Sequence, residues 1–215
     1  MHVKKGLRNL HQTDHLSLVI PSCKPETDEY YVRPQAAWER MKAARNSQQT
    51  VYIYGTTGSG KTSIVAAFLA RKQYCYIDMA TTGMEEFACV VQEIVSKADK
   101  KEYGPSILVI DDLHVLESQE DKSICGQIIE NMSMSEDVWL ILISRAPVPK
   151  WLKPVFVRSV FLTLGEKELY LTEKEQESYF ERWDISLTEA ANERVRQLGA
   201  GHPLALKIGA MLLKN

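Results

Sequence analysis

The sequence is poor in cysteine. Its 215 residues include four cysteines, Cys23, Cys75, Cys89 and Cys125. They are scattered along the chain and form no C-x-x-C pair, so the sequence predicts neither a disulfide framework nor a zinc site. A protein that uses cysteine in this way is typical of a reducing compartment, and we expect a cytoplasmic location.

Long hydrophobic runs and an excess of one charge are also missing. The apolar run Val138–Ile143 has six residues, whereas a membrane span needs about 20. Lys4, Lys5 and Arg8 are followed by no apolar stretch, which argues against a secretory signal. The 26 basic and 28 acidic residues give a net charge of -2. This balance argues against a module that mainly holds a nucleic-acid backbone, and we expect no membrane partner.

Short β-rich apolar runs alternate with helical patterns in the middle of the chain. The runs lie at residues 51–54, 74–79, 107–110, 138–143 and 157–164. Helical patterns lie at residues 62–71, at 82–97 with Thr82 and Glu85 as a capping box, and from Ser118 onward. This alternation predicts an α/β fold with a five-stranded parallel sheet between two helical layers, which is a three-layer sandwich.

The two ends of the chain have a different texture. Residues 1–31 have weak periodicity and are expected to form an N-terminal arm. A helix is predicted from Pro34, and residues 32–168 are predicted to form the α/β domain. After residue 168 the pattern is helical only, so residues 169–215 are predicted to form a small helical subdomain. Its three helices are expected at residues 172–183, 186–199 and 203–213.

Residues 55–62 read G-T-T-G-S-G-K-T, which is a complete G-x-x-x-x-G-K-[ST] pattern between a predicted strand and a predicted helix. Glycines let the loop turn tightly and point its N–H groups at phosphate oxygens, and the helix dipole adds positive potential. The lysine supplies a cation, and the final threonine supplies a hydroxyl for Mg²⁺. The pattern predicts a P-loop NTPase three-layer sandwich, with residues 32–168 as the nucleotide-binding domain, and it predicts that ATP or ADP binds here with Mg²⁺. The phosphate-binding residues are predicted to be Gly55, Thr56, Thr57, Gly58, Ser59, Gly60, Lys61, Thr62 and Ser63.

Two carboxylates follow the third apolar run. Asp111 and Asp112 stand at the carboxyl end of this strand, which is the edge where α/β sheets bind ligands. We predict that Asp111 is a Mg²⁺ ligand and that Asp112 polarises the attacking water. Asp112 has an alternative role as a cap for the following turn.

Arg145 follows the fourth strand directly. The spacing of about 50 residues between Lys61 and Asp111 predicts a strand inserted between the phosphate-loop strand and the acidic strand. If the fourth strand takes that place, Arg145 can contact the γ-phosphate. The alternative is a surface arginine at a strand exit.

Several segments in order resemble one family. Leu108–His114 is similar to the Walker B segment of the MalT-like, LuxR-type large ATP-dependent transcription regulators, which belong to the signal-transduction ATPases with numerous domains. Ser144-Arg145, Leu171-Thr172 with Glu175, and Val32-Arg33-Pro34 resemble further segments of that family. Residues 201–206 resemble the G-x-P-L motif of the related NB-ARC ATPases, in which the proline approaches the adenine.

The resemblance implies a slow ATPase switch in which inducer and ATP favour self-association. It implies that Pro203, with Arg33 from the other end of the chain, borders the adenine. His202 departs from the family pattern, and DNA binding would need a C-terminal domain that is absent here, so we expect a shortened or minimal chain. The alternatives are a metabolic kinase acting on a small substrate and an AAA-type motor or loader.

Overall fold

The computed structural model describes residues 25–99, 106–186, 188 and 199–214. Its centre is one parallel five-stranded sheet in the order β2-β3-β4-β1-β5. The strands are β1 (Thr50–Tyr54), β2 (Cys75–Asp78), β3 (Ser106–Asp111), β4 (Val138–Ser144) and β5 (Phe161–Leu164). The first four lie within one residue of the predicted bounds at each end. The predicted insertion of a strand between β1 and β3 is confirmed, and that strand is β4, which is the condition set for Arg145.

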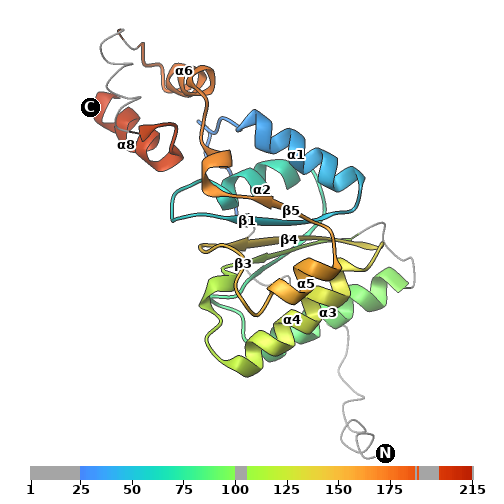
Figure 1. The fold of residues 1–215 in the computed structure, drawn as a ribbon. Coiled ribbons are helices and arrows are strands. Elements are labelled where there is room, and N and C mark those ends of the chain that lie inside the picture. The colour runs from blue at the N-terminus through green and yellow to red at the C-terminus, as the bar shows by residue number, and fades with distance from the viewer. Residues whose placement is uncertain (1–24, 100–105, 187, 189–198, 215) are drawn as a thin grey trace, which may run out of the picture.

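Helices cover both faces of the sheet (Figure 1). On one face lie α1 (Gln35–Asn46) and α2 (Lys61–Leu69), and on the other lie α3 (Met84–Asp99), α4 (Gln119–Ser133) and α5 (Lys153–Arg158). Alternate strand residues pack into separate cores on the two faces, because successive side chains of a strand point to opposite sides. This is the predicted three-layer α/β fold of P-loop NTPases.

Two predictions of local structure are wrong. The predicted strand at 157–164 is shorter, since α5 occupies residues 153–158 with Pro154 in its first turn, where proline is tolerated. Helix α3 begins at Met84 and not at Thr82. The carbonyl of Asp78 accepts the N–H of Thr82 at 2.9 Å, so Thr82 belongs to the turn after β2.

Two predicted helix starts are confirmed. The Ser118 hydroxyl accepts the N–H of Asp121 at 2.9 Å before α4. Thr172 and Glu175 form a capping box at the start of α6 (Glu173–Arg182). Each side chain satisfies a backbone donor that the helix itself leaves unpaired.

The segments after β5 pack beside the sheet domain. A short 3-10 turn, η2 (Glu166–Leu169), leads to α6, and α8 (Pro203–Lys214) completes the helical part. The helix predicted at residues 186–199 lies largely outside the described residues. Leu169 joins the core under α1 and α2, whereas Leu171 joins Phe180, Trp183 and Leu206 in a separate helical core.

The segment before α1 packs against this helical core. The ring of Tyr30 stacks on that of Trp183 with centroids 4.0 Å apart. Lys207 donates a hydrogen bond to Asp28 Oδ2 at 2.6 Å. The segment before α1 and the helical part after β5 therefore pack against each other. Among the described residues, no helix combines the length and the hydrophobicity that crossing a membrane would need.

Candidate functional site

The phosphate loop connects β1 to α2. Gly58 and Gly60 have φ angles of 82° and 89°, a region that favours glycine. Lys61 is the first residue of α2, and its Nζ donates to the carbonyl of Thr56 at 2.8 Å. The Ser59 hydroxyl donates to the same carbonyl, also at 2.8 Å. Burial lowers the pKa of the Lys61 ammonium, and the nearby carboxylates of Asp111, Asp112 and Glu166 oppose that shift.

Asp111 at the end of β3 is held by three donors. Its Oδ2 accepts from the Thr62 hydroxyl at 3.0 Å and from the Tyr76 hydroxyl at 2.7 Å, and its Oδ1 accepts the N–H of Asp112 at 2.6 Å. Burial and the Asp111 charge raise the pKa of Tyr76, so this phenol stays neutral and donates. The structure brings together Thr62 and Asp111, the two predicted metal ligands. No sequence motif pointed to Tyr76 on β2.

Asp112 has a left-handed backbone, with φ at 54°. It precedes the 3-10 turn η1 (Leu113–Val115), but its side chain makes no capping hydrogen bond there. Its Oδ1 lies 3.9 Å from Nε of Arg145 and 3.4 Å from Nδ1 of His114. Burial, helped by the neighbouring Asp111, raises the pKa of the Asp112 carboxyl. The two residues that we predicted as catalytic therefore lie side by side, at the ends of adjacent strands.

A cavity of about 340 Å³ lies between the phosphate loop and the helical part. Gly58, Gly60 and Ser63 line it from the loop and α2, and Pro203 and Leu204 line it from α8. The Leu204 N–H donates to the carbonyl of Gly58 at 3.2 Å. A Cβ at Gly58 would lie 2.6 Å from Leu204 Cδ2, so glycine also permits this close approach.

The structure places Arg33 away from this cavity. Its Nε donates to Gln35 Oε1 at 3.0 Å, and its guanidinium lies 5.0 Å from the centroid of the Trp38 ring. The same segment contributes Tyr31, Val32 and Pro34 to the cavity wall. Pro203 lines the cavity and Arg33 does not. That Pro203 borders the adenine stays a prediction.

Glu166, in η2, is a site residue that sequence reasoning missed. Its carboxylate accepts the Thr56 N–H at 2.9 Å and the Thr56 hydroxyl at 2.8 Å. It also accepts from the Tyr170 hydroxyl at 2.8 Å and lies 3.8 Å from His202 Nε2. These hydrogen bonds, the Thr56 N–H first, lower the pKa of Glu166 to about 2. Glu166 therefore connects the phosphate loop to the start of the helical part.

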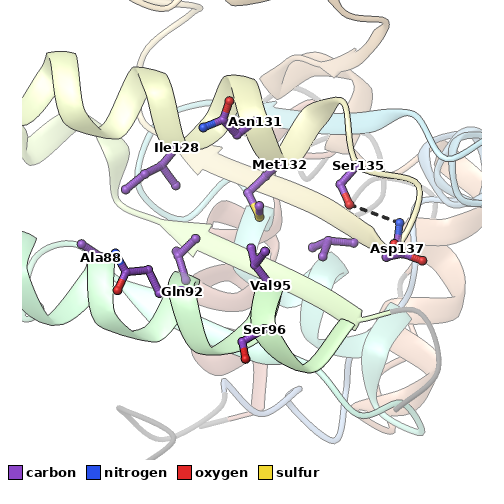
Figure 2. A pocket seen from close by; sticks show the side chains of 11 residues that line it. Ala88, Gln92, Val95, Ser96, Ile128, Asn131, Met132, Ser135 and Asp137 are labelled. Carbon is purple, nitrogen blue, oxygen red and sulfur yellow. Dashed lines mark hydrogen bonds between the residues drawn. The ribbon is translucent and has the colours of Figure 1, made fainter. Parts of the chain in front are cut away.

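A second cavity, of about 560 Å³, lies between α3 and α4. Figure 2 shows its apolar side chains, including Val95, Ile128 and Met132, with polar groups such as Gln92 and Asn131 around them. No residue of the phosphate loop or of the Asp111 cluster lines it. This cavity is the larger of the two, but residues of the phosphate loop line the 340 Å³ cavity and not this one.

The phosphate loop and the Asp111 strand end together identify the class of protein. A glycine-rich phosphate loop between strand and helix, with an acidic residue two strands away at the same sheet edge, is the arrangement of a P-loop nucleotide-binding domain. The signature of the ATPase family associated with various cellular activities (AAA) matches residues 51–161. The chain belongs to this family and is an AAA-type ATPase domain. No curated protein matches the chain.

Solved structures with low sequence identity share the fold. The Walker-type ATPase of Pyrococcus abyssi has a TM-score of 0.60 at 15% identity, over 91% of this chain and 72% of that chain. A STAND protein with a tetratricopeptide repeat sensor from Pyrococcus horikoshii has a TM-score of 0.59 at 17% identity, over 86% and 30%. AMPPCP-bound DnaA from Aquifex aeolicus has a TM-score of 0.53 at 17% identity, over 84% and 62%. The chain thus spans less than two thirds of the last two proteins.

Proposed function

We propose that this chain is an ATP- and ADP-binding switch module with slow ATPase activity. The nucleotide binds between the sheet domain, residues 32–168, and the helical subdomain, residues 169–215. The observation that carries this proposal is the 340 Å³ cavity, whose walls come from both parts. A ligand that contacts both parts stabilises the arrangement in which both contacts form, and this differential contact is what a switch requires.

The phosphate loop holds the phosphates. The N–H groups of the loop and the N-terminus of α2 point at the negative phosphates of the bound nucleotide, and the Lys61 ammonium binds the β- and γ-phosphates. In the structure this ammonium donates to the Thr56 carbonyl, and a phosphate oxygen offers it a charged acceptor. The lowered pKa of Lys61 follows from burial, and a bound phosphate would restore the preference for the charged form.

The oxygen atoms of Thr62 and Asp111 suit Mg²⁺. A hydroxyl and a carboxylate lie 3.0 Å apart, and hard oxygen donors are the ligands that Mg²⁺ takes, together with water and phosphate. When bound, the ion would neutralise charge on the β- and γ-phosphates. Tyr76 holds the Asp111 carboxylate in place from β2.

Asp112 and Arg145 are the proposed catalytic pair. A partly buried carboxylate with a raised pKa accepts a proton more readily than an ordinary one, which suits a base that polarises the attacking water. Arg145, 3.9 Å from this carboxylate, is the cation available at the γ-phosphate position. Its side chain is about half exposed, so it can turn from Asp112 towards a phosphate.

Within the AAA family we place the chain among the MalT-like signal-transduction ATPases. The order of the motifs from Val32 to Leu206 supports this, and so does the fold shared with the STAND protein. In this proposal, ATP favours self-association and ADP favours the closed monomer. DNA binding would belong to a C-terminal domain outside these 215 residues.

An AAA-type motor or loader is the second candidate, because the family match favours it directly. Such a protein needs an arginine supplied by a neighbouring subunit in a ring. Mass in solution separates the two: a switch is monomeric with ADP and assembles with a non-hydrolysable ATP analogue, whereas a ring-forming motor assembles with both. Family membership supports water over a small-molecule acceptor, so we place the kinase alternative behind both.

The proposal is tested by calorimetric titration with ADP, ATP and GDP. Adenine nucleotides are expected to bind and GDP to bind more weakly, because the base would lie in a cavity of fixed shape. Equal affinity for ADP and GDP, or no binding of ADP, would contradict it.

A further inference from the structure

The hydroxyl of Tyr31 is buried and lacks a hydrogen-bond partner among the described residues. Tyr31 lines the 340 Å³ cavity between the phosphate loop and α8. Buried polar groups are nearly always hydrogen-bonded in native proteins, and an exception needs an explanation. Because Tyr31 borders the cavity, a ligand there can supply the missing partner once a small turn of the ring brings the hydroxyl to the cavity surface.

The groups around Tyr31 do not supply that partner. Each carboxylate oxygen of Glu175 already accepts a backbone N–H, from Gln35 at 2.7 Å and from Thr172 at 2.8 Å. The Arg33 Nε donates to the Gln35 side chain. Burial raises the pKa of Tyr31, with Arg33 and Glu175 acting in opposite directions. The phenol therefore stays neutral and can both donate and accept.

The position of Tyr31 assigns it to the nucleoside half of the ligand. Gly60 stands at the phosphate loop, beside Lys61, and takes the phosphate end of the cavity. Val32, Leu171 and Pro203 line it together with Tyr31, and these apolar walls suit the faces of a flat ring better than a sugar rich in hydroxyls.

We propose that the Tyr31 hydroxyl forms a hydrogen bond with the base of the bound adenine nucleotide. Tyr31 is then a binding residue whose contact exists only in the loaded state. This inference rests on the proposed nucleotide-binding function and names a further residue of that site. It also explains how the segment before α1, which packs on the helical core, takes part in recognition.

The test compares the full chain with Tyr31→Phe, using ADP, 2′-deoxy-ADP and inorganic pyrophosphate in calorimetry. Tyr31→Phe is expected to weaken ADP and 2′-deoxy-ADP by about tenfold each, in line with one lost hydrogen bond in a buried site, and to leave pyrophosphate affinity unchanged. The melting temperature without ligand should stay the same or rise, since no partner in the protein is lost. Tyr30→Phe is the matched control and should leave ADP affinity unchanged, because Tyr30 precedes Tyr31 in the same segment but does not line the cavity.

Several results would overturn this assignment. Equal ADP affinity in Tyr31→Phe and the parent would show that the proposed hydrogen bond does not form, and it would leave the proposed function intact. If Tyr31→Phe weakens the binding of ADP but not that of 2′-deoxy-ADP, the hydroxyl contacts the ribose and not the base. A lower melting temperature together with weaker pyrophosphate binding shows a structural role. Failure of the parent itself to bind ADP would reject the inference and the proposed function together.

Discussion

Glu175 of α6 accepts the backbone N–H of Gln35, the first residue of α1, at 2.7 Å across 140 positions of the chain. The other oxygen of the same carboxylate accepts the N–H of Thr172, 2.8 Å away, within the capping box of α6. One side chain thus satisfies donors at the N-terminal ends of two helices, α1 and α6. The negative charge is also favourable at both positive helix ends.

Glu175→Ala is therefore expected to destabilise the protein by about 1–2 kcal/mol, a typical cost for a lost helix cap. Chemical denaturation followed by circular dichroism measures it. Glu177→Ala is the control, since it removes the same charge from an exposed position of α6. Equal stability of the two variants would show that the Glu175 bridge contributes nothing.

Lys61→Ala is expected to abolish ADP binding and to leave the fold intact. The substitution removes the cation that faces the phosphates, and its only described hydrogen bond is to a loop carbonyl. Calorimetry gives the affinity and thermal denaturation reports the fold, with the exposed Lys174→Ala as control. Binding of ADP by a folded Lys61→Ala protein at parental affinity would remove the phosphate-loop assignment.

Asp111→Asn and Asp112→Asn are expected to have different effects. The first should weaken the dependence of nucleotide binding on Mg²⁺, and it should also lower stability, because Asp111 is held by Thr62, Tyr76 and a backbone N–H. The second should keep binding and slow hydrolysis by about 10²-fold or more, as expected for a lost general base. Binding with and without Mg²⁺, and phosphate release, separate the two. Identical changes in both variants would make the division of roles wrong.

Glu166 is expected to make stability depend on pH in the acid range. Its pKa falls from the ordinary 4.5 to about 2 in the folded protein, chiefly through the Thr56 N–H. A depressed pKa contributes stability that is fully present above pH 4.5 and is lost as the pH falls towards 2. Melting temperatures between pH 6 and 2 should therefore fall more steeply for the parent than for Glu166→Gln, with the exposed Glu86→Gln behaving like the parent. Parallel curves for the parent and Glu166→Gln would contradict the hydrogen bonds to the loop.

The sequence predicted the parts of the site that depend on contiguous patterns. The phosphate loop and the Asp111 strand end each follow an apolar strand, and the spacing between them predicted that another strand lies between the two. Contacts of residues that belong to neither pattern could not be predicted. Glu166 contacts Thr56 across 110 positions, and Tyr76 contacts Asp111 across 35. Neither pair forms a local motif, because the packing of the folded chain brings it together.

The errors have local causes. Helix α5 is six residues long and rich in valine, so its pattern is close to that of a strand. Arg33 was expected at the base because its segment resembles a family motif, but its guanidinium lies over Trp38. Which residue of an irregular segment faces a cavity depends on backbone turns that no periodicity predicts.

The proposed function requires one nucleotide to contact both the sheet domain and the helical subdomain. Hydrogen exchange of the full chain with and without ADP, read by mass spectrometry, reports such contacts segment by segment. We expect ADP to slow exchange in three separate segments: residues 56–62 of the phosphate loop, residues 30–34 before α1, and residues 202–206 at the start of α8. Protection confined to the phosphate loop, with the other two segments unchanged, would show that the nucleotide does not connect the two parts.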